Sequence, residues 1–146
     1  MKIEIDQSGK VEATAVKTVV CDSLGNCIVV SSEDKKTIQE LYRIAGRPKM
    51  FVYELFSLLC ALVIKLSYSR AHTYRIDVEY FGQEDLLTRL ILQNLQKMKI
   101  YISSGQINFH RIGKKSKAHS YAYEVYKQLT KGQKIRLTTI LRYILQ

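Results

Sequence analysis

The sequence predicts an α/β fold: a mixed five-stranded sheet in the order βββαβαβα, with helices on both faces. Three observations predict it. Apolar and charged residues alternate at residues 2–6 and again at residues 74–79, as they do in strands. Three closely spaced strands open the chain, which favours antiparallel pairing, and helices separate the later strands, which favours parallel pairing. The length of 146 residues suits one hydrophobic core, so we expect a single domain over residues 1–146.

The first elements form a β-meander of three strands. Ile3 and Ile5 alternate with charged residues in the strand at 2–6, and residues 7–10 have the composition of a turn. A second strand is expected at 17–21 and a third at 27–31, with a turn at 24–26 between them.

Two helices come next. Serine and acidic residues at 31–34 indicate a helix start, and this helix is expected to end near Gly46. Pro48 favours a second helix start, after which residues 50–64 are apolar on every side except at Glu54. That stretch is shorter than the roughly 20 residues needed to span a membrane. We therefore expect a buried central helix, no membrane association and no signal peptide.

The second half of the chain alternates strands with helices. The expected elements are a strand at 74–79, an amphipathic helix at 84–99, a strand at 107–111, a basic loop at 113–117, a helix at 118–129 and a short helix at 137–145.

The three cysteines, Cys21, Cys27 and Cys60, are odd in number and lack CxxC spacing. This pattern argues against a disulfide framework or a zinc site and favours free thiols in a reducing, cytoplasmic compartment. The alternative is a bridge between Cys21 and Cys27, which flank a tight turn and could face each other across a hairpin.

The chain is strongly basic, with 23 Lys and Arg against 13 Asp and Glu and a net charge of +10. Much of the excess lies in residues 111–146, which hold nine basic residues and one acid, Glu124. Such a segment is typical of proteins that bind nucleic acid through phosphate contacts. A solvated basic surface without a nucleic-acid partner is the alternative.

Acidic residues at two expected strand ends are the candidate chemistry. If the strands of Asp6 and Asp77 are adjacent, their carboxylates meet at one edge of the sheet. Glu54 is the one acid of the apolar helix and needs a partner or a metal there. Converging carboxylates favour Mg²⁺ or Mn²⁺, and an Asp6–Asp77 separation of about 4–6 Å would suit a metal pair. The alternatives are that Asp6 forms a turn, Glu54 pairs with a basic residue, and Asp77 and Glu79 form a solvated strand face.

Four stretches carry a resemblance to a known family. Residues 3–9 (IEIDQSG) resemble the opening strand and turn of ribonuclease-H-like nucleases, and residues 75–79 (RIDVE) resemble their fourth strand. Glu54 matches the acid on their first core helix, and residues 113–119 (GKKSKAH) resemble the start of their last helix. The chain is also similar to poorly characterised prokaryotic members that open with Asp-x-Ser-Gly.

The resemblance implies a ribonuclease-H-like fold and a metal-dependent nuclease or resolvase that hydrolyses phosphodiesters of DNA or RNA. It implies Asp6, Glu54 and Asp77 as catalytic metal ligands. The family usually has an acid near the start of its last helix, where this chain offers His119 and, five residues on, Glu124. Five residues turn a helix by about 500°, so these two do not share a face, and His119 is the better placed. Glu79 and Glu124 are further candidates to complete the site.

Nucleic acid would be held by the basic residues around the last long helix, which are Arg111, Lys114, Lys115 and Lys117. Ser116 is positioned to cap that helix. Two other functions stay open: a non-catalytic nucleic-acid-binding or adaptor protein on the same fold, and a protein-interaction module for an acidic partner. The chain could act alone or as a homodimer.

Overall fold

The computed structural model describes residues 1–145, which form one mixed six-stranded sheet and five helices. The strands are β1 (Lys2–Ser8), β2 (Thr18–Asp22), β3 (Cys27–Val30), β4 (Thr73–Asp77), β5 (Ile107–His110) and β6 (Gln133–Lys134). The helices are α1 (Ser32–Ile44), α2 (Met50–Ser67), α3 (Glu84–Lys97), α4 (Lys117–Tyr126) and α5 (Leu137–Ile144), with a 3-10 turn, η1, at Ser104–Gln106. The predicted α/β class and mixed sheet are confirmed, with one strand more than expected.

The strands lie in the order β5-β4-β1-β2-β3-β6. The meander β1-β2-β3 is antiparallel, β4 and β5 run parallel to β1, and β6 runs parallel to β3. Consequently β1 and β4, distant in sequence, are neighbours, with Ile5 opposite Ile76. This register brings the carboxyl ends of both strands to the same edge of the sheet.

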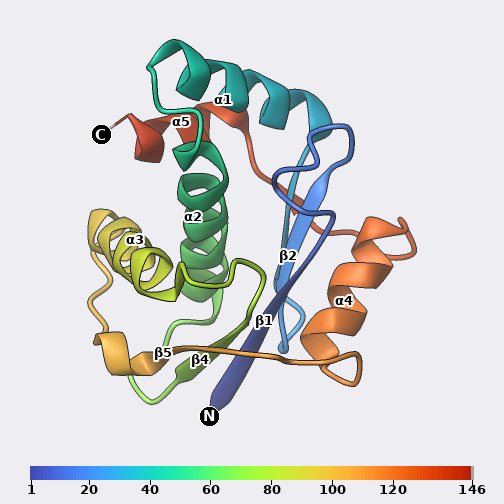
Figure 1. The fold of residues 1–146 in the computed structure, drawn as a ribbon. Coiled ribbons are helices and arrows are strands. Elements are labelled where there is room, and N and C mark those ends of the chain that lie inside the picture. The colour runs from blue at the N-terminus through green and yellow to red at the C-terminus, as the bar shows by residue number, and fades with distance from the viewer. Residues whose placement is uncertain (146) are drawn as a thin grey trace.

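Helices cover both faces of the sheet: α2 and α3 pack on one face and α4 on the other (Figure 1). Ile3 and Ile5 belong to the large core beneath α2. Successive side chains of a strand point to opposite faces, so Asp6 points to the α4 face. There, a smaller core joins β2 and β3 to α4; its buried members are Val19, Cys21, Cys27, Ala122 and Val125.

The helix α2 is long and apolar enough to cross a membrane, with a mean hydropathy of 1.9 over its 18 residues. Within the fold, however, all of Leu55–Ile64 is buried against the sheet and the neighbouring helices. The interpretation of this segment as the central buried helix is therefore confirmed.

Two features of the strands differ from the sequence prediction. The strand β4 ends at Asp77, so Glu79 lies just beyond it and not inside it. The strand β6 was not predicted, because it consists of two exposed polar residues, Gln133 and Lys134, that show no apolar alternation. It exists because their backbone pairs with Ile28 and Val29 of β3.

Cys21 and Cys27 form a disulfide, contrary to the expectation of free thiols. The two residues are register partners on β2 and β3, with their Cα atoms 4.1 Å apart, and only Cys60 is a free cysteine in residues 1–145. The odd number of cysteines obscured this pair, although the hairpin turn between them suggested the contact.

The turn after β1 is held by two unusual residues. Gly9 has a φ of +76°, and a Cβ atom there would lie 2.1 Å from the carbonyl oxygen of Lys17. Lys35 of α1 is fully buried, and its ammonium donates hydrogen bonds to the carbonyls of Lys10 and Ala13 and to the Thr18 hydroxyl. The segment that connects β1 to β2 is thus fixed by backbone geometry and by a buried cation.

Candidate metal centre

Three carboxylates meet at the ends of β1 and β4. Asp6, Asp77 and Glu79 each offer an oxygen, and these oxygens all lie within 4.8 Å of one another. Asp6 is buried, while Asp77 and Glu79 are half-buried. The predicted convergence of Asp6 and Asp77 is therefore confirmed, and Glu79 completes the group.

The sheet topology explains this convergence. Because Ile5 lies opposite Ile76 in parallel strands, the next residues, Asp6 and Asp77, occupy the same row of the sheet. Alternation then points the Asp6 and Asp77 side chains to the α4 face, and Glu79, two residues beyond the end of β4, brings its carboxylate to the same cluster. The pairing of the parallel strands β1 and β4 thus explains why Asp6 and Asp77 lie close together.

His119, on the first turn of α4, joins the cluster from above the sheet. Its Nδ1 lies 3.0 Å from Oδ2 of Asp6, and the other carboxylate oxygen, Oδ1, accepts a hydrogen bond of 2.8 Å from the Gln7 backbone N–H. The imidazole keeps 39% of its surface exposed, whereas the Asp6 side chain keeps 7%. His119 therefore links the buried carboxylate to solvent.

Asp77 is held by the loop between β5 and α4. The backbone N–H of Ile112 donates to Oδ1 of Asp77 at 2.8 Å. The same loop ends at Ser116, whose hydroxyl accepts a hydrogen bond from the Ala118 N–H and caps α4, as the sequence indicated. The β5–α4 loop therefore contacts Asp77 near its beginning, through Ile112. His119, three residues after the end of this loop, contacts Asp6.

Burial and neighbouring negative charge raise the pKa of two of these carboxyls, Asp6 and Glu79. Burial raises the pKa of Asp6, the neighbouring Asp77 charge raises it further, and the His119 hydrogen bond opposes this shift. Burial and the adjacent Asp77 and Asp6 carboxyls raise the pKa of Glu79 to about 7. No basic side chain forms an ion pair with Asp77 or Glu79 in the described part of the chain.

The structure does not bring Glu54 to this cluster, so its prediction as a metal ligand is wrong. Oε1 of Glu54 accepts a hydrogen bond of 2.7 Å from the Tyr42 hydroxyl, and Oε2 forms an ion pair with Arg47. The alternative given by the sequence, pairing with a basic residue at the rim of the core, is the observed one. The extra helix α1 and the turn after it supply both partners.

Glu124 also lies outside the acidic cluster that residues 1–145 form. It follows His119 by five residues on α4, and the structure agrees with the expectation that the two do not share a face. Of the two candidates to complete the site, Glu79 is therefore the one that does so. The sequence indicated this role only through the position of Glu79, two residues after Asp77.

Four basic residues lie in the connection before α4 and at its first residue: Arg111, Lys114, Lys115 and Lys117. They are exposed, and they flank Ile112 and His119, the two residues that contact Asp77 and Asp6. The candidate phosphate-binding residues are therefore close in sequence to two residues that contact the acidic cluster.

No protein-family model, no curated protein and no solved structure matches this chain.

Proposed function

We propose that this protein is a ribonuclease-H-like, divalent-metal-dependent nuclease or resolvase that hydrolyses phosphodiesters of nucleic acid. The observation that carries the proposal is the meeting of Asp6, Asp77 and Glu79 within 4.8 Å. The adjacency of β1 and β4 and the approach of α4 to the acids support the same fold family, because the resemblance implies that these elements surround the site.

The donor set fits Mg²⁺ or Mn²⁺. Three carboxylates offer hard oxygen ligands, which these ions prefer, and the imidazole of His119 is also compatible with Mn²⁺. Burial, together with the neighbouring Asp77 and Asp6 carboxyls, raises the pKa of Glu79 to about 7, and a bound cation would neutralise this negative charge. Asp6, Asp77 and Glu79 would hold the ion, with Glu79 as the third ligand instead of Glu54.

The basic residues and His119 would have distinct tasks. When bound, the metal would lower the charge on the phosphodiester and promote attack by water. Arg111, Lys114, Lys115 and Lys117 would bind the phosphates on either side of the scissile bond. His119 orients Asp6 through its Nδ1 and, being partly exposed, can carry a proton between the site and solvent.

The test is a cleavage assay on the full chain with Mg²⁺ or Mn²⁺. The substrates are single-stranded RNA, an RNA–DNA hybrid, duplex DNA and a four-way DNA junction, each end-labelled. We expect metal-dependent cleavage of at least one of them, and loss of that cleavage in Asp6→Asn and Asp77→Asn. Glu33→Gln, an exposed acid on α1 away from the cluster, is the matched control and should keep full activity.

Calorimetric titration with Mn²⁺ separates catalysis from binding. We expect the wild type and Glu33→Gln to bind Mn²⁺ and Asp77→Asn to lose binding. If Mn²⁺ neither binds nor raises the melting temperature, and no substrate is cleaved, the nuclease proposal is wrong. Salt-dependent nucleic-acid binding without cleavage would then favour the non-catalytic alternative.

A further inference from the structure

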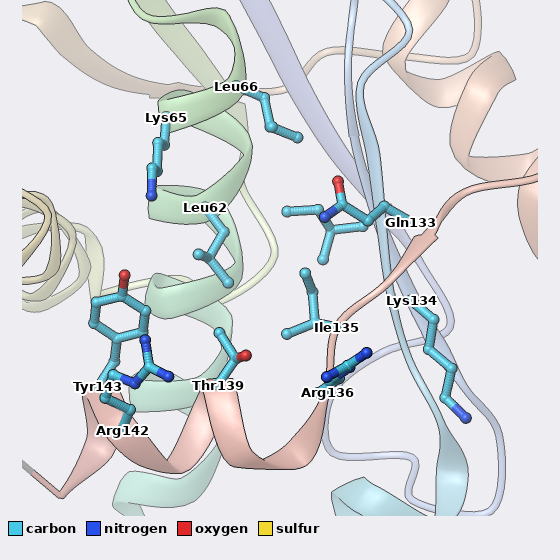
Figure 2. Close-up of a pocket in the computed structure, with 11 residues that line it drawn as sticks. Leu62, Lys65, Leu66, Gln133, Lys134, Ile135, Arg136, Thr139, Arg142 and Tyr143 are labelled. Carbon is cyan, nitrogen blue, oxygen red and sulfur yellow. The ribbon is translucent and has the colours of Figure 1, made fainter.

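A pocket lies between α2, α5 and the edge of the sheet formed by β3 and β6 (Figure 2). Its volume is about 460 Å³, within the range of about 300–1,000 Å³ that is usual for small-molecule sites. It is open to solvent on one side, and nothing in the proposed nuclease function uses it.

Four basic residues line this pocket. Lys65 comes from α2, Lys134 from β6, and Arg136 and Arg142 from the start and the last turn of α5. None of the residues that line the pocket is acidic, and none of these four forms an ion pair within residues 1–145. Four uncompensated cations around one cavity make it attractive to an anion, and arginine in particular binds phosphate in a bidentate manner.

The floor of the pocket is apolar. Ile28, Leu62 and Ile135 are buried, and Leu62 and Ile135 lie between Arg142 on one side and Arg136 and Lys134 on the other (Figure 2). The ring of Tyr143 forms part of the wall beside Arg142. A bare inorganic anion would leave this apolar surface unused, whereas a ligand with a flat, weakly polar portion would cover it.

Neutral hydrogen-bonding groups complete the lining. The amide of Gln133 and the hydroxyl of Thr139 both border the cavity. Each can donate and accept, so together they suit the edge of a heterocycle or the hydroxyls of a sugar. Charge, apolar floor and neutral polar groups therefore match the three parts of a nucleoside monophosphate.

The pocket is separate from the metal centre. Ile28 and Leu62 belong to the large core on the α2 face, whereas Asp6 contacts His119 on the α4 face. The basic segment of residues 111–145 is thus divided between two places: the loop before α4 lies at the opposite end of the molecule from α5 (Figure 1). A single continuous nucleic-acid surface does not account for both groups of cations.

We propose that this pocket is a binding site for a small organic phosphate of mononucleotide size. Arg142 and Lys65, on the same side of Leu62 (Figure 2), bind the phosphate, and the flat portion lies over Leu62 and Ile135 toward Arg136. The proposal does not depend on the metal centre, because none of these residues takes part in it.

Calorimetric titration of the full chain with AMP, in EDTA so that metal plays no part, tests the site. We expect AMP to bind with a Kd of about 1 mM or tighter, and adenosine and inorganic phosphate each to bind at least tenfold more weakly. Arg142→Gln and Arg136→Gln should each weaken AMP binding about tenfold or more. Lys36→Gln, an exposed cation on α1 that does not line the pocket, should bind AMP like the wild type.

Three results would overturn the proposal. AMP that does not bind at millimolar concentration, or that binds no better than inorganic phosphate, would exclude an organic phosphate site. If Arg142→Gln weakened binding of a single-stranded oligonucleotide but left AMP binding unchanged, the pocket would be part of a nucleic-acid surface. Asp6→Asn, which should bind AMP normally, distinguishes failure here from failure of the proposed nuclease function.

Discussion

His119 Nδ1 lies 3.0 Å from Asp6 Oδ2, a contact between residues 113 positions apart in the chain. It joins α4 to β1 at the one carboxylate of the acidic cluster that is buried. Because the other oxygen of Asp6 is held by the Gln7 backbone N–H, the carboxylate has one orientation in the fold. In the proposed metal centre, His119 would therefore act by positioning the Asp6 carboxylate.

This relationship predicts the effect of replacing His119. We expect His119→Ala to lower metal-dependent cleavage about 10–100-fold, the usual effect of losing a group that orients a metal ligand. His119→Asn, whose amide can reach the place of Nδ1, should recover part of the loss. Cleavage rates at saturating Mn²⁺ measure both effects. Equal loss in the two variants would contradict a positioning role through this hydrogen bond.

The variant Glu54→Gln tests whether Glu54 takes part in metal binding. Since Glu54 pairs with Arg47 and Tyr42, we expect Mn²⁺ affinity to stay at the wild-type value. The free energy of unfolding should fall by about 1 kcal/mol, because a partly exposed ion pair is lost. Arg47→Gln, which removes the other partner, is the matched control and should cost a similar amount. A variant Glu54→Gln that no longer binds Mn²⁺ would restore Glu54 to the site.

Gly9→Ala should destabilise the fold through a clash and backbone strain together. The added Cβ would lie 2.1 Å from the Lys17 carbonyl oxygen and 2.6 Å from the Tyr126 ring, at a φ of +76°. We expect a loss of roughly 3 kcal/mol in urea denaturation. Gly46→Ala has a similar φ of +74° but no atom within 4 Å, so it should lose only about 1 kcal/mol. Equal losses would show that the close approach at Gly9 is unimportant.

The burial of Lys35 should make the free energy of unfolding depend on pH. Burial lowers its pKa to about 8 in the folded protein, whereas an exposed lysine titrates near 10.4. Between about pH 8 and pH 10 the unfolded chain therefore binds more protons than the folded one, and this group makes stability rise with pH. Lys35→Met should lack that rise. Urea denaturation of both proteins across this window measures the difference, and parallel curves would contradict the lowered pKa.

Reduction of the Cys21–Cys27 disulfide should lower the free energy of unfolding by roughly 2 kcal/mol, the low end expected for a short loop. The bridge closes a separation of only six residues. Thiol titration in denaturant should find one reactive thiol per chain, Cys60, before reduction and three after it. Cys60→Ser checks the assignment, since it should leave no thiol before reduction. Three thiols in protein purified under oxidising conditions would contradict the pairing.

Most of the fold could be predicted because its signals are local. Alternation at Ile3 and Ile5 identified β1, and the apolar run around Leu55–Ile64 identified α2 as buried. The strand β6 could not be predicted, because its pairing with β3 is set by where the chain returns after α4 and not by its own two residues.

The site was predicted in part for the same reason. Asp6 and Asp77 follow from strand ends and topology, which a pattern of residues contains. Glu54 was misassigned because a buried acid needs some partner, and the sequence does not reveal that Tyr42 and Arg47 fold back over α2 to provide it. The choice between a metal and an ion pair depended on tertiary contacts.

The two residues of β6 have a consequence for solubility. They are the only strand paired with the outer side of β3 in the described chain, and the adjacent Ile135 N–H also bonds to the Val29 carbonyl. A chain truncated before Gln133 would expose the amides and carbonyls of Cys27–Val30, an apolar strand, to other molecules. The short return of the chain at β6 thereby covers an edge at which another strand could otherwise pair.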